Sequence, residues 1–287
     1  MTTFPRTTVG GLSVSRMIIG TNWFCGFSHQ TPARDAYIKE NILTNRKVVA
    51  DILEVFLRAG IDTIMGILHE YPTVLDAIKE AEDRTGVHCI KIDTPIINTA
   101  DTDQARGEVK ALFDKVAELG TEICMPHHVS VEQLIDKGQK KIHRIDDYTK
   151  MIRERGMIPG LSAHMPEVVL YADANNNDVD TYIQIYNAAG FLMQVEIDWI
   201  NNVIWNAKKP VMTIKPMAAG RVPPFVAFNF VWNTIRPQDM VTVGTMSPRE
   251  AEEVIELSMA ILEGRRPEVA IRGTPAKGNL STKKDCH

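Results

Sequence analysis

Short apolar segments alternate with longer segments of helical periodicity along most of the chain. Val48, Ile52 and Phe56 recur at the spacing of one helix face, which predicts a helix over residues 45–59. The apolar run that follows, residues 61–66, is too short for a helix and has the length of a buried strand. Repeated along the chain, this alternation predicts parallel strands that are joined by crossover helices.

Eight such units can be counted, which predicts a single (β/α)8 TIM-barrel domain over residues 1–287. A short hairpin is expected before the first strand, and residues 275–287 are expected to form a loose polar tail. A doubly wound open sheet is the alternative, but no GxGxxG motif follows an early strand. The predicted strands cover residues 17–20, 61–66, 87–93, 121–126, 157–162, 190–198, 210–221 and 239–244, and residues 166–174 and 178–190 are assigned to helices.

Residues at the predicted helix ends support these boundaries. Thr44 is the expected N-cap of the helix over residues 45–59, and Gly60 is expected to end it. Pro72 is expected to begin the next helix, where its missing N–H costs nothing, and Gly86 to close it. The loop over residues 21–35 looks too irregular for a helix.

The composition is that of a globular protein, with 44% hydrophobic and 24% charged residues. The formal net charge of −4 gives no reason to expect nucleic acid or an anionic membrane as a partner. No apolar run approaches the roughly 20 residues that span a bilayer, and the first residues lack the build of a signal peptide. The four cysteines form no CxxC pair, so a reducing cytoplasm is the expected location. A homo-oligomer is left open.

Several predicted strands are followed by polar side chains, which a parallel barrel brings to one face. His127 and His128 follow the fourth strand, and His164 follows the fifth. Together with a carboxylate they could hold a divalent metal such as Zn, Mn or Fe, although a barrel mouth gathers polar residues in any case and the spacing only permits such a site. For His127, a catalytic or substrate-orienting role and a hydrogen-bonded structural role explain the position equally well. The side chains that could complete such a set are Asp93, Glu196 and His69.

Two further features point to the same face. Lys215 lies at the end of the seventh predicted strand, where a buried lysine has to be paired, for example with Glu196 or a ligand anion, or lose its proton. Trp23, Phe24 and Phe27 in the first loop could form a substrate wall or belong to the core.

An ordered series of segments resembles the aldo-keto reductases. The matching segments are VGGLSVSRMIIGTN, RAGIDT, ICMPH, GMIPGLSAHMPE, QVEID, TIKPMAAGR and VGTMSPREAEE. That family reduces carbonyl compounds with NADPH, using a tyrosine as the acid together with lysine, histidine and aspartate. The resemblance implies Tyr71, Lys91 and His127 as catalytic residues, with the aspartate position on Met65 or Gly66. His164 is a further catalytic candidate.

The resemblance also implies an NADP site in the second half of the barrel. Ser162 and Gln194 match residues that bind the nicotinamide amide, and Lys215 replaces an aromatic residue that stacks on the ring. The helix that begins at TMSPRE would hold a cofactor phosphate, although Ser247 could equally be a plain helix cap. The complete set of implied cofactor-binding residues is Ser162, Gln194, Lys215, Arg221, Thr245, Ser247 and Arg249.

Three hypotheses follow. The first is an NADP(H)-dependent oxidoreductase of the aldo-keto reductase type that acts on a small carbonyl or alcohol. The second is a metal-dependent isomerase, lyase or hydrolase at the carboxyl-terminal face of the barrel, with the metal among His127, His164 and a carboxylate. The third is a catalytically silent barrel that binds a ligand.

Overall fold

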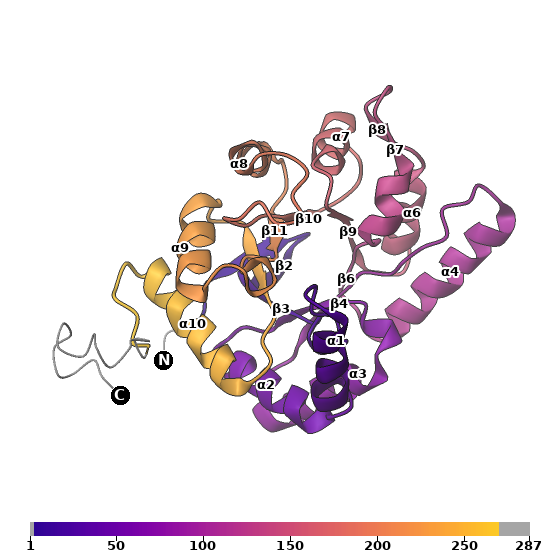
Figure 1. The fold of residues 1–287 in the computed structure, drawn as a ribbon. Coiled ribbons are helices and arrows are strands. Elements are labelled where there is room, and N and C mark those ends of the chain that lie inside the picture. Colours follow the sequence, from indigo (N-terminus) through magenta and orange to yellow (C-terminus); the bar gives the residue numbers. More distant parts are fainter. Residues whose placement is uncertain (1–2, 270–287) are drawn as a thin grey trace, which may run out of the picture.

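Eight parallel strands close into a barrel in the computed structural model, which describes residues 3–269 (Figure 1). The barrel strands pair in chain order, and the last pairs with the first. Helices lie around the outside, which confirms the (β/α)8 fold. The barrel strands are β3 (Met17–Gly20), β4 (Thr63–Gly66), β5 (Ile90–Asp93), β6 (Ile123–Cys124), β9 (Ile158–Ala163), β10 (Thr181–Ile185), β11 (Val211–Ile214) and β12 (Met240–Val243).

Each of these strands is followed by a helix that packs against the barrel. The helices are held against the barrel by their apolar faces rather than by intrinsic helix propensity, because each helix buries one stripe of side chains against the strands. The helices are α2 (Arg46–Arg58), α3 (Pro72–Thr85), α4 (Asp103–Glu118), α6 (Ile145–Arg153), α7 (Glu167–Asn175), α8 (Ile197–Asn206), α9 (Pro224–Thr234) and α10 (Pro248–Leu262).

Apolar side chains fill the interior of the barrel. Successive side chains of a strand point to opposite faces, so Ile90 and Ile92 point inward while Lys91 between them points to the surrounding helices. The interior cluster contains Ile18, Met65, Ile90, Ile92, Ile123, Met125, Ile183, Met212 and Met240. Because this cluster leaves no open channel, a ligand site has to lie at one end of the barrel.

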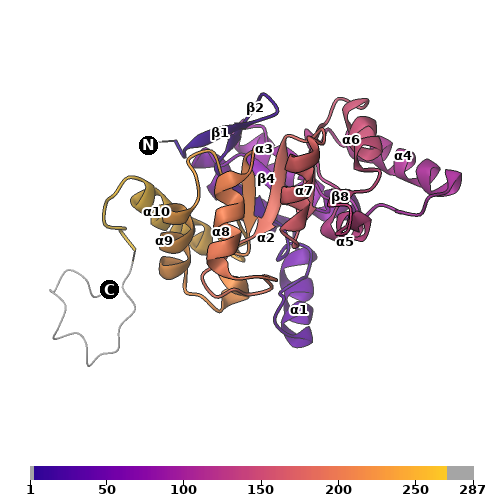
Figure 2. The same cartoon turned by 90° about the horizontal axis from the view of Figure 1, so that it is seen from above.

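The predicted N-terminal hairpin covers one of those ends. It consists of β1 (Arg6–Val9) and β2 (Leu12–Ser15), and both Val9 and Val14 join the interior cluster. Gly10 at its tip packs near Ile158 and Asp180, at the beginnings of β9 and β10. Figure 2 shows this hairpin on the side of the barrel opposite α1 (Pro32–Ile38). The amino-terminal end is therefore closed, and the carboxyl-terminal end remains for a site.

The remaining short elements lie in the connections that follow β3, β4, β6 and β11. The connection after β3 contains α1 and the π-helix η1 (Lys39–Leu43). The prediction that residues 21–35 are irregular was wrong at its end, because Thr31 caps a helix that begins at Pro32. The other short elements are η2 (Leu68–Glu70), α5 (His128–Val131), η3 (Glu132–Leu134), β7 (Ile135–Asp136), β8 (Lys141–Ile142) and η4 (Ala218–Gly220).

The predicted sixth strand was wrong. Residues 190–198 form turns and the first two residues of α8, whereas residues 181–185, predicted as helix, form β10. β10 is buried at every position and pairs with both β9 and β11. Its Tyr182, Ile183 and Ile185 are β-formers, but their spacing also fits one face of a helix.

One predicted helix cap was also wrong. Asn45, not Thr44, caps α2, since the Asn45 side chain accepts a hydrogen bond from the N–H of Val48. The Thr44 hydroxyl instead donates to the carbonyl of Glu40 at 2.9 Å. The predicted start of α3 at Pro72 and its end at Gly86, which has a left-handed backbone, are confirmed.

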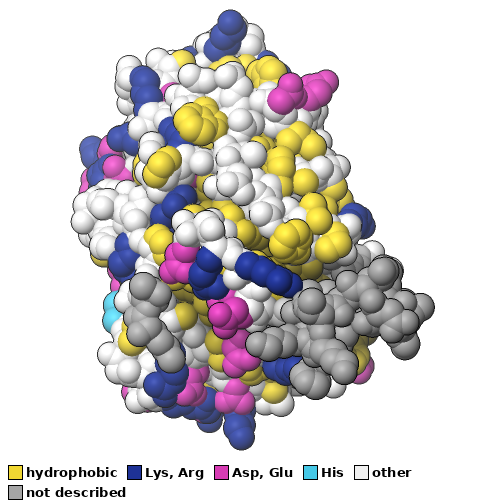
Figure 3. Space-filling model, turned by 90° about the vertical axis from the view of Figure 1, so that its left-hand side faces the viewer, with side chains coloured by type: hydrophobic (Ala, Val, Ile, Leu, Met, Phe, Trp, Pro, Cys, Tyr) yellow, Lys and Arg dark blue, Asp and Glu magenta, His cyan; other side chains and the backbone are white. Residues whose placement is uncertain are grey.

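The outer surface contains some large apolar side chains. Trp199 and Trp205 on α8 and Phe225 and Val226 on α9 are exposed. Figure 3 shows the side of the molecule that carries α9 and α10, where apolar side chains gather between charged ones. The predicted homo-oligomer stays a prediction.

In the described part of the chain, no helix is both long and apolar enough to cross a membrane. Cys25, Cys89 and Cys124 are buried and unpaired. The tail that was predicted to be loose, residues 275–287, lies outside the described residues, and so does Cys286. The extent of the single domain stays a prediction.

Gly160 tests the close packing of the barrel. An added Cβ there would lie 2.7 Å from Met125 Cε and 2.9 Å from the carbonyl oxygen of Thr181. We expect Gly160→Ala to lower the free energy of unfolding in urea by about 1–3 kcal/mol through overpacking. Gly107 in α4 is the control, because a Cβ there meets nothing within 4 Å. Gly107→Ala should raise the same free energy by roughly 0.5–1 kcal/mol, and equal effects of the two substitutions would contradict this account.

Candidate functional site

A cavity of about 370 Å³ lies at the carboxyl-terminal end of the barrel. Each of the eight barrel strands, or the residues just after it, contributes to the lining, from Gly20 at the end of β3 to Gly244 after β12. The floor and walls are largely apolar, with Met65, Ile183 and Ile214 among them. The closed barrel therefore brings residues from distant parts of the sequence to one pocket.

The ionisable side chains that line this cavity are basic, and none of those described is acidic. Four histidines and one lysine line it: His29, His127, His128, His164 and Lys215. No aspartate or glutamate is among its described lining residues. A ligand therefore meets hydrogen-bond donors and one amine, but no negative charge.

His127 follows β6 and is the N-cap of α5. Its Nδ1 accepts a hydrogen bond of 3.4 Å from the N–H of Val129, so the ring proton belongs on Nε2. Burial, and the nearby His128 and Lys215, lower the pKa of His127 to about 4. At neutral pH His127 is a neutral imidazole whose Nε2–H is available as a donor.

His128 and His164 stack in the same cavity. Their rings are 3.6 Å apart between centroids and 18° from parallel. Burial is the main cause that lowers the pKa of His164 to about 3, with His128 and Lys215 adding to it. Glu132 in η3 fixes the turn after β9, because its Oε1 accepts hydrogen bonds from the N–H groups of His164 and Met165 at 2.6 and 2.9 Å.

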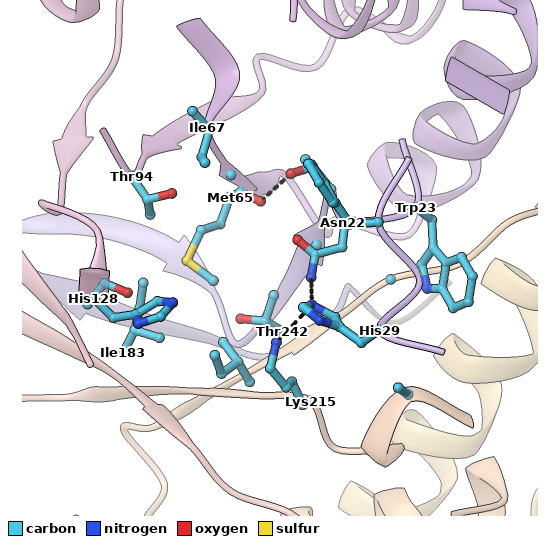
Figure 4. Close-up of a pocket in the computed structure, with 18 of the residues that line it drawn as sticks. Asn22, Trp23, His29, Met65, Ile67, Thr94, His128, Ile183, Lys215 and Thr242 are labelled. Carbon is cyan, nitrogen blue, oxygen red and sulfur yellow. Dashed lines mark hydrogen bonds between the residues drawn. The ribbon is translucent and has the colours of Figure 1, made fainter. Parts of the chain in front are cut away.

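Lys215 lies just after β11 with a left-handed backbone (φ 60°), which is uncommon for a residue with a side chain. Figure 4 shows its amine beside His29, and Nζ lies 3.2 Å from His29 Nε2. Asn22 Nδ2 lies 2.9 Å from the same His29 nitrogen. Both partners are donors, so His29 Nε2 accepts and the ring is neutral. Burial lowers the pKa of Lys215 to about 8.

The loop between β3 and α1 closes one side of the cavity. It contributes Trp23 and Phe27 to the wall, whereas Phe24 is fully buried in the core. Gln30 Nε2 donates to the carbonyl of Ala219 at 2.8 Å and ties this loop to η4. Sequence reasoning did not assign a role to His29, because the only signal was a histidine in a polar and aromatic loop.

Two of the four residues predicted to be catalytic lie in the cavity. His127 and His164 line the cavity, whereas Tyr71 and Lys91 do not. Tyr71 lies at the beginning of α3 and packs against the core, where burial raises its pKa. The amine of Lys91 lies against Gly120 after α4, outside the barrel interior.

The position that the resemblance assigns to an aspartate is closed by packing. Met65 fills the barrel interior, and a Cβ on Gly66 would collide with the hydroxyl of Thr21. That hydroxyl donates to the carbonyl of Met65 at 3.0 Å. Asp93 at the end of β5 is buried and pairs with His69, with Nδ1 and Oδ1 2.8 Å apart.

The residues predicted to bind NADP are divided in the same way. Ser162 and Lys215 line the cavity. Gln194 is exposed, and the glutamine on the sixth strand is instead Gln184, whose Nε2 donates to the carbonyl of His164 at 3.3 Å. The guanidinium of Arg221 lies 4.1 Å from the ring centre of Phe191, outside the lining.

Thr245, Ser247 and Arg249 lie around the beginning of α10 rather than in the cavity. Ser247 caps this helix by accepting from the N–H of Glu250 at 3.2 Å. Glu250 Oε2 in turn accepts from the N–H of Met246 at 2.7 Å, as in a capping box. The contacts of Ser247 are thus those of a helix N-cap. Arg249 is exposed.

No metal centre is formed by the described residues. They contain no group of three or more His, Cys, Asp or Glu side chains placed to hold an ion. His128 and His164 stack face to face, Asp93 is engaged with His69, and Glu196 is exposed at the beginning of α8. The suggested metal set of His127, His164 and a carboxylate is therefore not assembled.

Comparison with solved structures agrees with the barrel. A candidate aldo-keto reductase from Pseudomonas aeruginosa has a TM-score of 0.64 at 17% identity, covering 90% of this chain and 96% of that one. An aldo/keto reductase from Klebsiella pneumoniae, in complex with NADP and acetate, has a TM-score of 0.57 at 14% identity, covering 94% and 92%. D-psicose 3-epimerase in the presence of D-fructose has a TM-score of 0.50 at 13% identity, covering 87% and 97%.

No protein-family model matches the sequence, and the search of curated proteins found no match. At these identities the structural likeness shows the fold. It does not transfer a substrate or a cofactor.

His127 and His164 make the stability of the fold depend on pH. Their pKa values of about 4 and about 3 lie below the ordinary value of 6.5, which applies to the unfolded chain. Above about pH 6.5 both rings are neutral in the folded and in the unfolded chain. As pH falls below 6.5, the two histidines take up protons in the unfolded chain but not in the folded one, so the free energy of unfolding decreases. We expect the double variant His127→Gln/His164→Gln to lose less free energy of unfolding than the wild type between about pH 7 and about pH 5.

Urea unfolding at several pH values measures this difference. A double variant with the wild-type pH dependence would show that the two imidazoles are not held neutral by the fold.

Proposed function

We propose that the protein transfers hydride between NADP(H) and a small carbonyl compound or alcohol bound at the carboxyl-terminal mouth of the barrel. The observation that carries the proposal is that His127, with a proton on Nε2, and the Lys215 amine line one cavity whose described lining contains no carboxylate. Such donors stabilise negative charge that develops on a carbonyl oxygen. The fold likeness to a candidate aldo-keto reductase, and to one in complex with NADP, supports the same reaction class.

The proton donor in this proposal is Lys215. Tyr71, which the resemblance implies as the acid, does not line the cavity. A general acid is most effective when its pKa is close to the working pH, and the pKa of Lys215 is lowered to about 8 by burial. Lys215 therefore delivers the proton to the alkoxide oxygen while His127 orients the carbonyl.

Neighbouring side chains support proton donation by Lys215 and hydrogen bonding by His127. The apolar walls, including Met65 and Ile183, limit the water around the reacting oxygen and strengthen its hydrogen bonds. Neutral His127 and His164 place no positive charge beside Lys215 at neutral pH, so its ammonium form is not opposed by them.

The residues present fit a dinucleotide cofactor at two places. Ser162 lines the cavity, where its hydroxyl would hold the nicotinamide amide. The capping box of α10 already uses two amides, so the guanidinium groups of Arg249 and Arg34 would hold the phosphate. Arg34 reaches this helix end, with Nη2 3.6 Å from Met246 Sδ. When bound, the cofactor supplies or accepts the hydride.

The proposed substrate is small, because a cavity of about 370 Å³ is near the lower end of ligand pockets. We also propose a cytoplasmic location, because the three described cysteines are buried and unpaired.

The substitution Lys215→Met tests the assignment of the acid. With NADPH and a panel of small aldehydes and ketones, kcat/KM should fall by about 10²–10⁴ in this variant. In the wild type, kcat/KM should fall as pH rises above about 8, because the ammonium form of Lys215 is lost. The loss of absorbance of the reduced nicotinamide measures both effects.

The control is Lys91→Met, which removes a lysine that points away from the cavity and should keep the wild-type rate. A protein that does not bind millimolar NADPH by calorimetry would overturn the hydride-transfer proposal, and would favour a ligand-binding barrel. Equal losses in both lysine variants would overturn the role of Lys215.

A further inference from the structure

The proposed reduction uses Lys215 only as an acid, and its free amine is a second reactive form. At the end of β11 this amine faces a largely apolar cavity and contacts a neutral histidine. We infer that Lys215 is a nucleophile that forms a covalent imine with carbonyl compounds in the barrel mouth. This activity would give the same cavity a second, cofactor-independent reaction.

The position of Lys215 favours nucleophilic attack. Its Nζ lies 3.2 Å from His29 Nε2, and Figure 4 shows the two side chains directed toward each other. A lysine is activated as a nucleophile when it is desolvated in an apolar pocket, because the free amine is then populated near neutral pH. Ile214 and Met217 supply apolar surface on the same side of the cavity.

Burial, rather than a neighbouring charge, favours the free amine of Lys215. The titratable groups that line the cavity are four histidines, of which His127 and His164 are neutral at physiological pH. The carboxylates behind this lining are already engaged: Glu132 accepts from the His164 N–H, and Asp35 accepts from the Ser28 N–H at 2.7 Å. No described carboxylate in the lining stabilises the ammonium form of Lys215 as an ion pair.

The reaction balances with one proton from solvent. The lone pair of Nζ attacks the carbonyl carbon, the C–N bond forms as the C=O π bond breaks, and one N–H proton passes through His29 Nε2 to the former carbonyl oxygen. In the resulting neutral carbinolamine, His29 takes up a proton from solvent and donates it to the hydroxyl, the C–O bond breaks, and water leaves. The nitrogen lone pair completes the C=N bond and the nitrogen keeps its remaining proton, so the product is an iminium.

An iminium makes the neighbouring carbon acidic, because its electrons can delocalise onto nitrogen. His164 is a neutral imidazole in the same cavity and can accept the proton from that carbon. The substrate class is therefore a small aldehyde or ketone that carries an α-hydrogen. The expected chemistry is exchange of that hydrogen or aldol-type bond formation and cleavage.

Reductive trapping tests the inference with the whole protein. Dihydroxyacetone and glycolaldehyde are the probes, each added with sodium cyanoborohydride and without NADPH, and the products are analysed by intact and peptide mass spectrometry. At about pH 7 a lysine with a pKa of about 8 has roughly two hundred times more free amine than an ordinary lysine. We expect one adduct per chain, located on the peptide that contains Lys215.

Two variants make the result specific. Lys215→Arg keeps the positive charge but removes the nucleophile, and should abolish the adduct, whereas Lys91→Met should retain it. Circular dichroism and thermal unfolding of both variants check that they fold. The trapping rate should rise as pH increases through about 8, opposite to the reduction rate, because it depends on the free amine.

An adduct that is absent, that is spread over surface lysines, or that persists in folded Lys215→Arg would overturn the inference. The inference does not depend on the proposed hydride transfer. Trapping without NADPH binding would leave the imine site standing alone, and NADPH-dependent reduction without trapping would leave only the acid role of Lys215.

Discussion

Closure of the eight-stranded barrel is the constraint on which the other features depend. Because β12 pairs with β3, each barrel strand has a neighbouring strand on both sides, and all carboxyl-terminal strand ends meet at one rim. Alternation along each strand then divides the side chains between the packed interior and the surrounding helices. What remains for function is the short stretch just after each strand, where His127, His164 and Lys215 lie.

This rim differs electrostatically from the rest of the buried protein. Outside the cavity, buried Arg236 and Asp239 lie 2.7 Å apart, and buried Asp93 contacts His69. Among the described residues, the amine of Lys215 has a neutral imidazole as its hydrogen-bond partner and no carboxylate. Leaving a basic group without an opposite charge costs stability unless the group becomes neutral. The cavity therefore favours uncharged rings at His127 and His164 and an amine that titrates near physiological pH.

The sequence was sufficient to predict the barrel and much of its rim, because both depend on local patterns. Strand runs with histidine or lysine at their ends placed His127, His164 and Lys215 correctly on one face. The sequence was not sufficient where the same residues fitted both the helical and the strand pattern. Residues 181–185 fit both a helix face and a buried strand, and only pairing with β9 and β11 decides between them.

Long-range contacts account for the other differences. His29 enters the cavity because its loop is tied to η4 more than one hundred and fifty positions later, which no local spacing shows. Lys91 points outward because the register of β5 places Ile90 and Ile92 inside. Gly66 offers no room for a side chain because Thr21, on a neighbouring connection, occupies that space.

The central claim is that the barrel mouth holds the imidazoles of His127 and His164 neutral. The most direct measurement is a pH titration of the histidine rings by nitrogen NMR on uniformly labelled protein, with His127→Gln and His164→Gln used to assign the signals. The account predicts that the rings of His127 and His164 are still neutral at about pH 5, well below the ordinary histidine pKa near 6.5. Titration of both rings near 6.5 would contradict it.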